Sequence, residues 1–118
     1  KLIAIAALAL AGVAHAGDDW DQTEKIMGST LLAVTAVDMM QTITIAGHPD
    51  IWYEYNPILG RHPSKVQVYG YFLVSGIIGY NIIDALPHSW RKGTMGTLMA
   101  VEVGMVAHNY SIGIRMGF

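Results

Sequence analysis

Apolar residues fill three long segments of the chain, and most charged and turn-forming residues lie between them. The segments cover 26–47, 66–86 and 93–114, and each is 21 or 22 residues long. A helix needs about 20 mainly apolar residues to cross the hydrocarbon core of a bilayer. The pattern therefore predicts an all-α membrane bundle of three transmembrane helices, with 17–118 as a single domain. A buried helical hairpin in a soluble complex is the alternative interpretation of the same pattern.

Capping residues mark where the first two helices begin. Asp21-x-x-Glu24 precedes the first segment, and Ser64-x-x-Gln67 follows Pro63 before the second. In such patterns, side chains bond to the free N–H groups of the first helical turn. We therefore expect helices to start close to these residues.

Residues 1–16 have the layout of a secretory signal peptide. One lysine precedes an Ala/Leu run that ends in the triplet AHA, an A-x-A cleavage site before Gly17. The alternative is a retained signal anchor that forms a short fourth helix. Both cases place residue 17 outside the cytoplasmic membrane, so the loop 48–65 and the C-terminus are expected in the cytoplasm. The predicted location is the bacterial cytoplasmic (inner) membrane, with several spans.

The composition agrees with a membrane location and excludes several classes of function. Hydrophobic residues make up 53% of the chain and charged residues 14%, whereas soluble domains carry about 25% charged residues. The net charge of −2 offers no basic patch for nucleic acid. The absence of cysteine rules out disulfides, zinc–thiolate sites and thiol catalysis. The expected partner is the lipid bilayer.

Two carboxylates, Asp38 and Glu102, lie close to the middle of their predicted spans. A charge at that depth is costly unless it is paired, protonated or in contact with water. One hypothesis is a proton relay or a metal pocket. The other is that hydrogen bonds from neighbouring polar residues fix the register of the helices. The candidate intramembrane polar site comprises Asp38, Gln41, Thr42, Asn81, Glu102, His108 and Asn109.

Small side chains recur every three or four residues along the third segment. They form one helix face, opposite to Glu102 and Asn109. In lipid, such a face lets another helix approach closely, which favours packing where hydrophobicity cannot. The predicted helix-packing residues are Gly93, Gly96, Ala100, Gly104, Ala107 and Ser111.

The connection at 48–64 is the most distinctive stretch of the sequence. Its three prolines restrict the backbone, and Asn-Pro followed by glycine is typical of a turn. Its histidines and acidic residues are candidate metal ligands, although their spacing fits no standard zinc pattern. The alternative is that Glu54 pairs with Arg61 and the aromatic residues lie at the membrane interface. The candidate loop motif consists of Glu54, Asn56, Pro57, Gly60, His62 and Pro63.

These motifs together carry a resemblance. The run Asp38-x-x-Gln41-Thr42, the loop E-x-N-P-x-x-G-x-H-P and the hydrophobic span after it resemble a family of uncharacterised small integral membrane proteins. Members occur in bacteria and in some of their phages, and the similarity covers about 34–110. The resemblance implies a membrane protein. The family has no established activity, so the resemblance implies no mechanism.

The sequence as a whole predicts a non-enzymatic protein. We expect a small structural or accessory membrane subunit that packs by its Gly/Ala face in a homo-oligomer or a larger membrane complex. One alternative is a proton or ion relay, or a metal-binding membrane protein, built on Asp38 and Glu102. Another is a phage-encoded lysis or virion membrane protein. No phosphate-binding loop, nucleophile elbow or H-E-x-x-H motif occurs, so no catalytic residue is assigned, and no cofactor other than a metal ion is considered.

Overall fold

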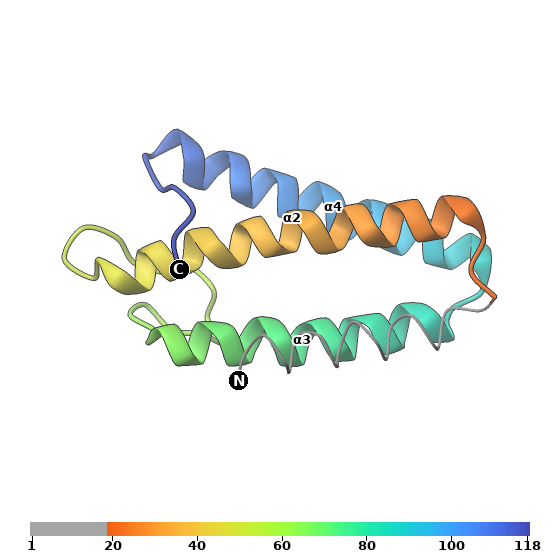
Figure 1. Cartoon of the computed structure of the whole chain (residues 1–118), viewed down its shortest axis with the longest axis horizontal. Helices are drawn as coiled ribbons and strands as arrows, with labels where there is room; N and C mark the ends of the chain where they lie inside the picture. Colours follow the sequence, from red (N-terminus) through yellow and green to blue (C-terminus); the bar gives the residue numbers. More distant parts are fainter. Residues whose placement is uncertain (1–18) are drawn as a thin grey trace.

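Three helices make up most of residues 19–118, the part of the chain that the computed structural model describes. They are α2 (Gln22–Gly47), α3 (Lys65–Ala85) and α4 (His88–Ser111), and residues 19–118 contain no strand (Figure 1). The predicted all-α class is confirmed. The predicted signal peptide or short fourth helix at 1–16 lies outside the described residues.

Side-chain caps set the starts of α2 and α3. The Asp21 side chain accepts a hydrogen bond from Glu24 N at 2.8 Å, and the Glu24 side chain accepts one from Asp21 N at 2.9 Å. Ser64 and Gln67 form the same reciprocal pair before α3. These bonds satisfy N–H groups that have no partner within a first helical turn. Both helices therefore begin directly after the capping residue.

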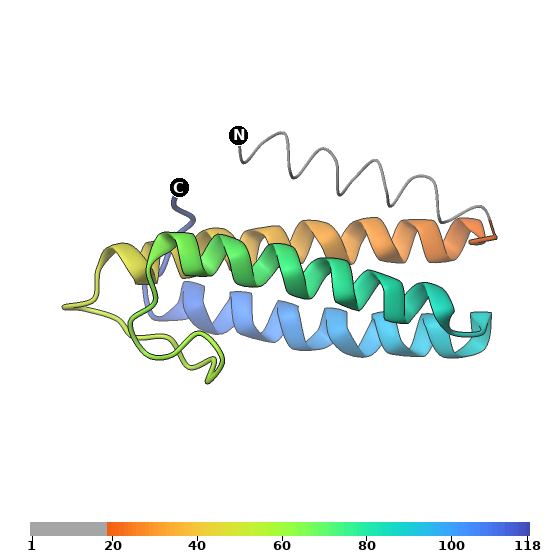
Figure 2. The ribbon, with the colours of Figure 1, turned by 90° about the horizontal axis from the view of Figure 1, so that it is seen from below.

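The helices pack side by side with alternating direction. Figures 1 and 2 show α2 and α4 running one way and α3 running the other way. Helix α2 packs mainly against α4, and α3 makes fewer contacts with either. Residues 19–25 and 83–92 therefore share one end of the bundle, which we call the cap end. Residues 47–65 and 110–118 share the other, the loop end.

The observed limits differ from the predicted ones most at α4. This helix begins at His88 instead of 93 and ends at Ser111 instead of 114. Its charged first turns lie within the helix because other helices supply partners for them, as described below. It ends before Gly113, whose φ of +97° turns the chain. Helix α2 starts at Gln22 instead of 26, and α3 matches its prediction within one residue.

Two helices, α2 and α3, are long and apolar enough to cross a membrane. Helix α4 has sufficient length, with 24 residues, but does not have the same apolar character. Glu102, His108 and Asn109 interrupt its apolar residues. Length and composition therefore support two of the three predicted spans.

Polar side chains occupy much of the interior, while large apolar side chains face outward. On α3 and α4, seven large aliphatic residues are between 41% and 57% exposed: Val74, Ile77, Ile78, Ile82, Leu98, Val101 and Val103. The buried polar residues are Glu24, Asp38, Gln41, Thr42, Glu54, Arg91 and Asn109. A bundle that faces water has the opposite arrangement.

The residues after α4 fold back onto α2 (Figure 1). The side chain of Ile114 is buried, Gly117 N donates to Met40 O at 2.9 Å, and the Thr44 hydroxyl donates to Arg115 O at 2.6 Å. A Cβ atom on Gly117 would lie 2.5 Å from Thr44 Oγ1, so this approach requires glycine. The tail is thereby tied to α2 at the loop end.

Candidate functional sites

A buried polar cluster joins α2 to α4. Asn109 Nδ2 donates to Asp38 Oδ1 at 3.4 Å and to Gln41 Oε1 at 3.2 Å. Gln41 Nε2 donates to Val106 O at 3.3 Å, and the Thr42 hydroxyl donates to Asp38 O at 2.9 Å. These side chains bond across the helix interface or back to their own helix, and a shift of α4 along α2 would break the bonds between helices. The structure thus brings together four of the predicted polar-site residues.

Glu102 and Glu54 add two carboxylates to this region. Glu102 Oε2 is buried and has no hydrogen-bond partner. Both glutamates act electrostatically on Asp38. Glu54 comes from the 48–64 loop and is buried as well. Glu102 of α4 and Glu54 of the loop therefore each lie near Asp38 of α2, although only Asp38 and Glu102 were predicted to share a site.

Asn81 and His108, two further predicted polar-site residues, lie apart from this cluster. Asn81 is exposed on α3, where its Nδ2 donates to Ile77 O of the same helix at 2.7 Å. His108 is exposed on α4 and lies beside Tyr55, with 6.5 Å between the ring centroids. Neither side chain belongs to the hydrogen-bonded group around Asp38.

Hydrogen bonds within the loop motif hold the 48–64 loop in shape. Asn56 N donates to Glu54 Oε1 at 2.9 Å, and Asn56 Oδ1 accepts from Ile58 N at 3.0 Å. Gly60 N donates to Asn56 O at 3.0 Å, and Gly60 has a φ of +78°, a conformation that favours glycine. Pro57 supplies a fixed φ within this turn. Most residues of the motif therefore have a structural role.

The alternative expectation that the side chains of Glu54 and Arg61 pair is wrong. Glu54 N donates to Arg61 O at 2.9 Å, while the Arg61 guanidinium lies 4.6 Å from the centre of the Tyr53 ring. The Glu54 carboxylate is buried, where it accepts a bond from the turn, so it is not available to a surface arginine. Of the last motif residues, His62 is exposed and Pro63 is buried.

The small-residue face of α4 points away from α2 and α3. All six predicted packing residues are exposed. Among the described residues, no other part of the chain comes within 4 Å of a Cβ atom placed on Gly93 or Gly104. At Gly96 the nearest such atom is Met27 Cε, at 3.8 Å. The described part of the chain therefore does not use this face.

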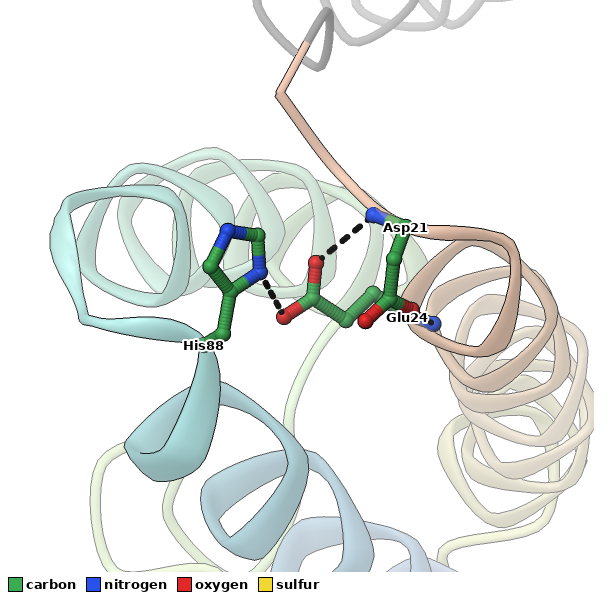
Figure 3. Close-up of side chains that lie close together, drawn as sticks. All are labelled: Asp21, Glu24 and His88. Carbon is green, nitrogen blue, oxygen red and sulfur yellow. Dashed lines mark hydrogen bonds and ion pairs between the residues drawn. The ribbon is translucent and has the colours of Figure 1, made fainter.

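A second buried cluster lies at the cap end, and the sequence analysis did not predict it. Glu24 is fully buried. Its Oε1 atom lies 2.7 Å from His88 Nδ1, and its Oε2 atom accepts from Asp21 N at 2.9 Å and from Arg91 Nη1 at 3.3 Å. Figure 3 shows the Glu24 carboxylate between Asp21 and His88. One carboxylate thus joins the start of α2 to the start of α4.

Arg91 extends this cluster to α3. Its Nε atom donates to Ile83 O at 3.1 Å, and Nη2 donates to Asp84 O at 2.6 Å. The last carbonyl groups of a helix lack partners within the helix and attract a cation. Arg91 therefore caps α3 while its Nη1 atom binds Glu24 of α2. The Trp20 indole N–H donates to Asp84 Oδ1 at 2.7 Å and closes the cluster from the N-terminal side.

The cap-end cluster has a spacing that a metal ion can bridge. Ligand atoms of Asp21, Glu24 and His88 all lie within 4.8 Å of one another. The Asp21 carboxylate, however, lies 2.7 Å from Lys92 Nζ, and Glu24 is bonded to Arg91. The hydrogen bond from Lys92 lowers the pKa of the Asp21 carboxyl group. Because cations of the chain already neutralise both carboxylates, the geometry favours an ion-pair cluster over a metal centre.

The sequence carried a signal for this cluster. Asp19, Asp21 and Glu24 precede the first span, and the cations of 88–92 precede the third. In a bundle of three alternating helices, the first and third helices start at the same end. The two groups of opposite charge therefore had to lie close together.

No protein-family model, no curated protein and no solved structure matches this chain. The functional interpretation therefore depends on the geometry described above.

Proposed function

We propose that this chain is a small integral membrane protein with three transmembrane helices, and that it acts as a structural or accessory subunit. The observation that carries the proposal is the reversed distribution of side chains. Polar residues such as Glu24, Asp38 and Asn109 are buried between helices, while the aliphatic residues of α3 face outward. Lipid solvates apolar surfaces and requires polar groups to find partners inside the protein.

Helix α4 fits as the third span because two of its most polar residues, Arg91 and Asn109, point inward. Arg91 and Asn109 are 3% and 7% exposed, and each bonds to another helix. A helix of 24 residues is about 36 Å long, enough for a hydrocarbon core of about 30 Å. Hydropathy understates α4 as a span, because it counts Arg91 and Asn109, which lipid would not contact.

The small-residue face of α4 is the proposed packing surface. Its exposed residues leave room for the backbone of another helix, and close backbone contact is a main source of helix association in lipid. The partner is a second copy of the chain or a larger membrane complex. The proposed location is the bacterial cytoplasmic membrane, with the loop end in the cytoplasm.

Carbonate extraction tests membrane insertion. Alkaline carbonate strips peripheral proteins from membranes and leaves spanning proteins in the pellet. We expect the full chain in the pellet. Its release into the supernatant would overturn the membrane assignment.

The packing surface is tested with a matched pair of variants. Gly104→Leu places a large side chain on the small-residue face and should weaken the oligomer or complex in mild detergent by tenfold or more, about 1.4 kcal/mol. Gly70→Leu makes the same change on α3, where Gly70 is exposed with no neighbour within 4 Å. Equal assembly of the two variants, measured by analytical ultracentrifugation, would count against the surface.

A second function, a proton or ion relay, is favoured by one observation. Glu102 Oε2 is buried without a hydrogen-bond partner near Asp38 and Glu54. A carboxylate oxygen without a partner is available to hold a proton or a cation, and acidic groups inside membranes commonly serve ion transfer.

Conservative substitutions separate the two functions. Asp38→Asn and Glu102→Gln keep shape and most hydrogen bonds but remove charge and proton exchange. A structural role predicts normal assembly and normal phenotype in both variants, and poor assembly in Asp38→Leu. Normal assembly of the amide variants with loss of ion binding or of proton flux in liposomes would establish the relay instead.

A further inference from the structure

Among the described residues, no Asp or Glu side chain pairs with the three Lys and Arg residues of the loop end. Every ion pair within residues 19–118 lies at the cap end. Arg61, Lys65 and Arg115 are all exposed. Lys65 Nζ donates to Phe118 O at 3.1 Å, and Arg115 Nη1 donates to Tyr110 O at 2.9 Å. The guanidinium groups of Arg61 and Arg115 thus contact ring faces and backbone carbonyls, and their charges remain available to an external anion.

Exposed apolar side chains occupy the same end of the bundle. Ile58 and Val66 are each 79% exposed, Phe118 is 85% exposed and Tyr55 is 66% exposed. Water does not favour so many large apolar groups at one end. A ligand for this end must therefore accept both apolar side chains and cations.

Aromatic rings accompany two of the cations. The guanidinium of Arg61 lies 4.6 Å from the Tyr53 ring centre, and that of Arg115 lies 3.7 Å from the Tyr110 ring centre. Tyrosine rings are typical of the zone where a membrane meets water. Both pairs thus combine a cation with a tyrosine ring, a combination expected where a membrane meets water.

We propose that the loop end binds anionic phospholipids. Arg61, Lys65 and Arg115 contact the lipid phosphates, and the neighbouring aromatic and aliphatic side chains enter the interfacial layer. The exposed cations of this end outnumber its exposed acidic side chains, because within residues 47–65 and 110–118 Glu54 is buried and Asp50 alone is exposed. The inference rests on the proposed membrane location and does not depend on packing through α4.

Lipid retention tests the proposal on the full chain. The protein is reconstituted in nanodiscs of mixed phosphatidylcholine and phosphatidylglycerol and then extracted in mild detergent. Native mass spectrometry measures the ratio of the two lipids that remain bound. We expect phosphatidylglycerol to be enriched over its fraction in the disc. Each of Arg61→Gln, Lys65→Gln and Arg115→Gln should lower the enrichment by up to about fivefold.

A control variant and a check of folding sharpen the test. Lys25→Gln removes an exposed cation at the cap end and should keep the enrichment of the wild type. Circular dichroism must show wild-type helix content in each variant, and Arg61→Gln alone suffices if another variant unfolds, because its side chain contacts only an exposed loop ring.

Several results would overturn the proposal. Unchanged enrichment in all folded loop-end variants, or no enrichment in the wild type, excludes a lipid site. If added inorganic phosphate abolishes the enrichment and chloride at the same ionic strength does not, the site binds small anions instead of lipid. Failure to enter any nanodisc contradicts the membrane location itself, which is a separate outcome.

Discussion

The cap end and the loop end of the bundle each carry three Lys or Arg residues, but they hold them differently. At the cap end, Arg91 and Lys92 bind carboxylates, and Arg91 is buried among three helices. Lys25 is exposed and has no ion pair with any residue of 19–118. At the loop end all three cations are exposed, and backbone hydrogen bonds hold the chain together.

The contrast shows that partners and burial decide whether a charged side chain contributes to folding or to binding. A buried guanidinium must be neutralised within the protein, so it becomes part of the fold. An exposed cation at a membrane surface interacts with solvent or lipid and contributes little to folding. Substitutions at the cap end should therefore change stability, whereas substitutions at the loop end should change binding.

The largest effect is expected from Arg91→Met. This change leaves Glu24 buried without its cation and removes the cap from the last carbonyl groups of α3. Loss of one partner from a buried ion pair costs about 3–5 kcal/mol. Thermal or denaturant unfolding in mild detergent measures the loss. The matched change at the loop end, Arg61→Met, should cost less than about 1 kcal/mol, and equal losses would remove the distinction between the ends.

A smaller effect is expected from Gly60→Ala. The positive φ of Gly60 is unfavourable for alanine, so the loop should lose about 1 kcal/mol of stability. Gly70→Ala is the control, because Gly70 lies in α3 with open space around it and should gain up to about 1 kcal/mol. Hydrogen exchange of the loop amides should increase in the first variant. Unaltered exchange there would mean that the turn does not depend on glycine.

The smallest effect is expected from pH at Asp21. Because Lys92 lowers the pKa of Asp21 in the folded state, their bond stabilises the fold above the ordinary pKa of an aspartate. This contribution disappears as the pH falls through the lowered value. Asp21→Asn keeps a good N-cap residue but removes the charge, so its stability should depend less on pH in the acid range. Asp50→Asn, at the loop end, should follow the wild type, and an Asp21→Asn profile parallel to the wild type would contradict the prediction.

Much of the fold followed from local signals in the sequence. The capping boxes at Asp21 and Ser64 place the starts of α2 and α3, because the bonds involved join residues only three positions apart. The start of α4 was misplaced because its first turn carries Arg91 and Lys92, which favour a loop when no partner is known. Their partners lie in α2, and Glu24 and Arg91 are separated by 67 residues.

Part of the candidate site also followed from the sequence. Buried polar residues in apolar segments indicate contact between helices, and Asn109 of α4 does donate to both Asp38 and Gln41 of α2. The burial of Glu54 could not be predicted, because it depends on how the loop folds back over the bundle. The signal peptide, the oligomer, the third span and the membrane location stay predictions.

If the proposed membrane location holds, the short connection between α3 and α4 has a consequence for biogenesis. Leu86 and Pro87 alone separate the two helices, so a ribosome that has delivered α3 delivers the start of α4 immediately afterwards. Alone in the translocon, α4 would expose Arg91 and Glu102 to lipid, at a cost of about 2.5–3.5 kcal/mol for an arginine at the centre of a helix and less near its end. As a hairpin with α3, it already places Arg91 on the carbonyl groups of Ile83 and Asp84. Insertion of α4 should thus be conditional on α3, and a chain from which α3 is deleted should release α4 to the aqueous side.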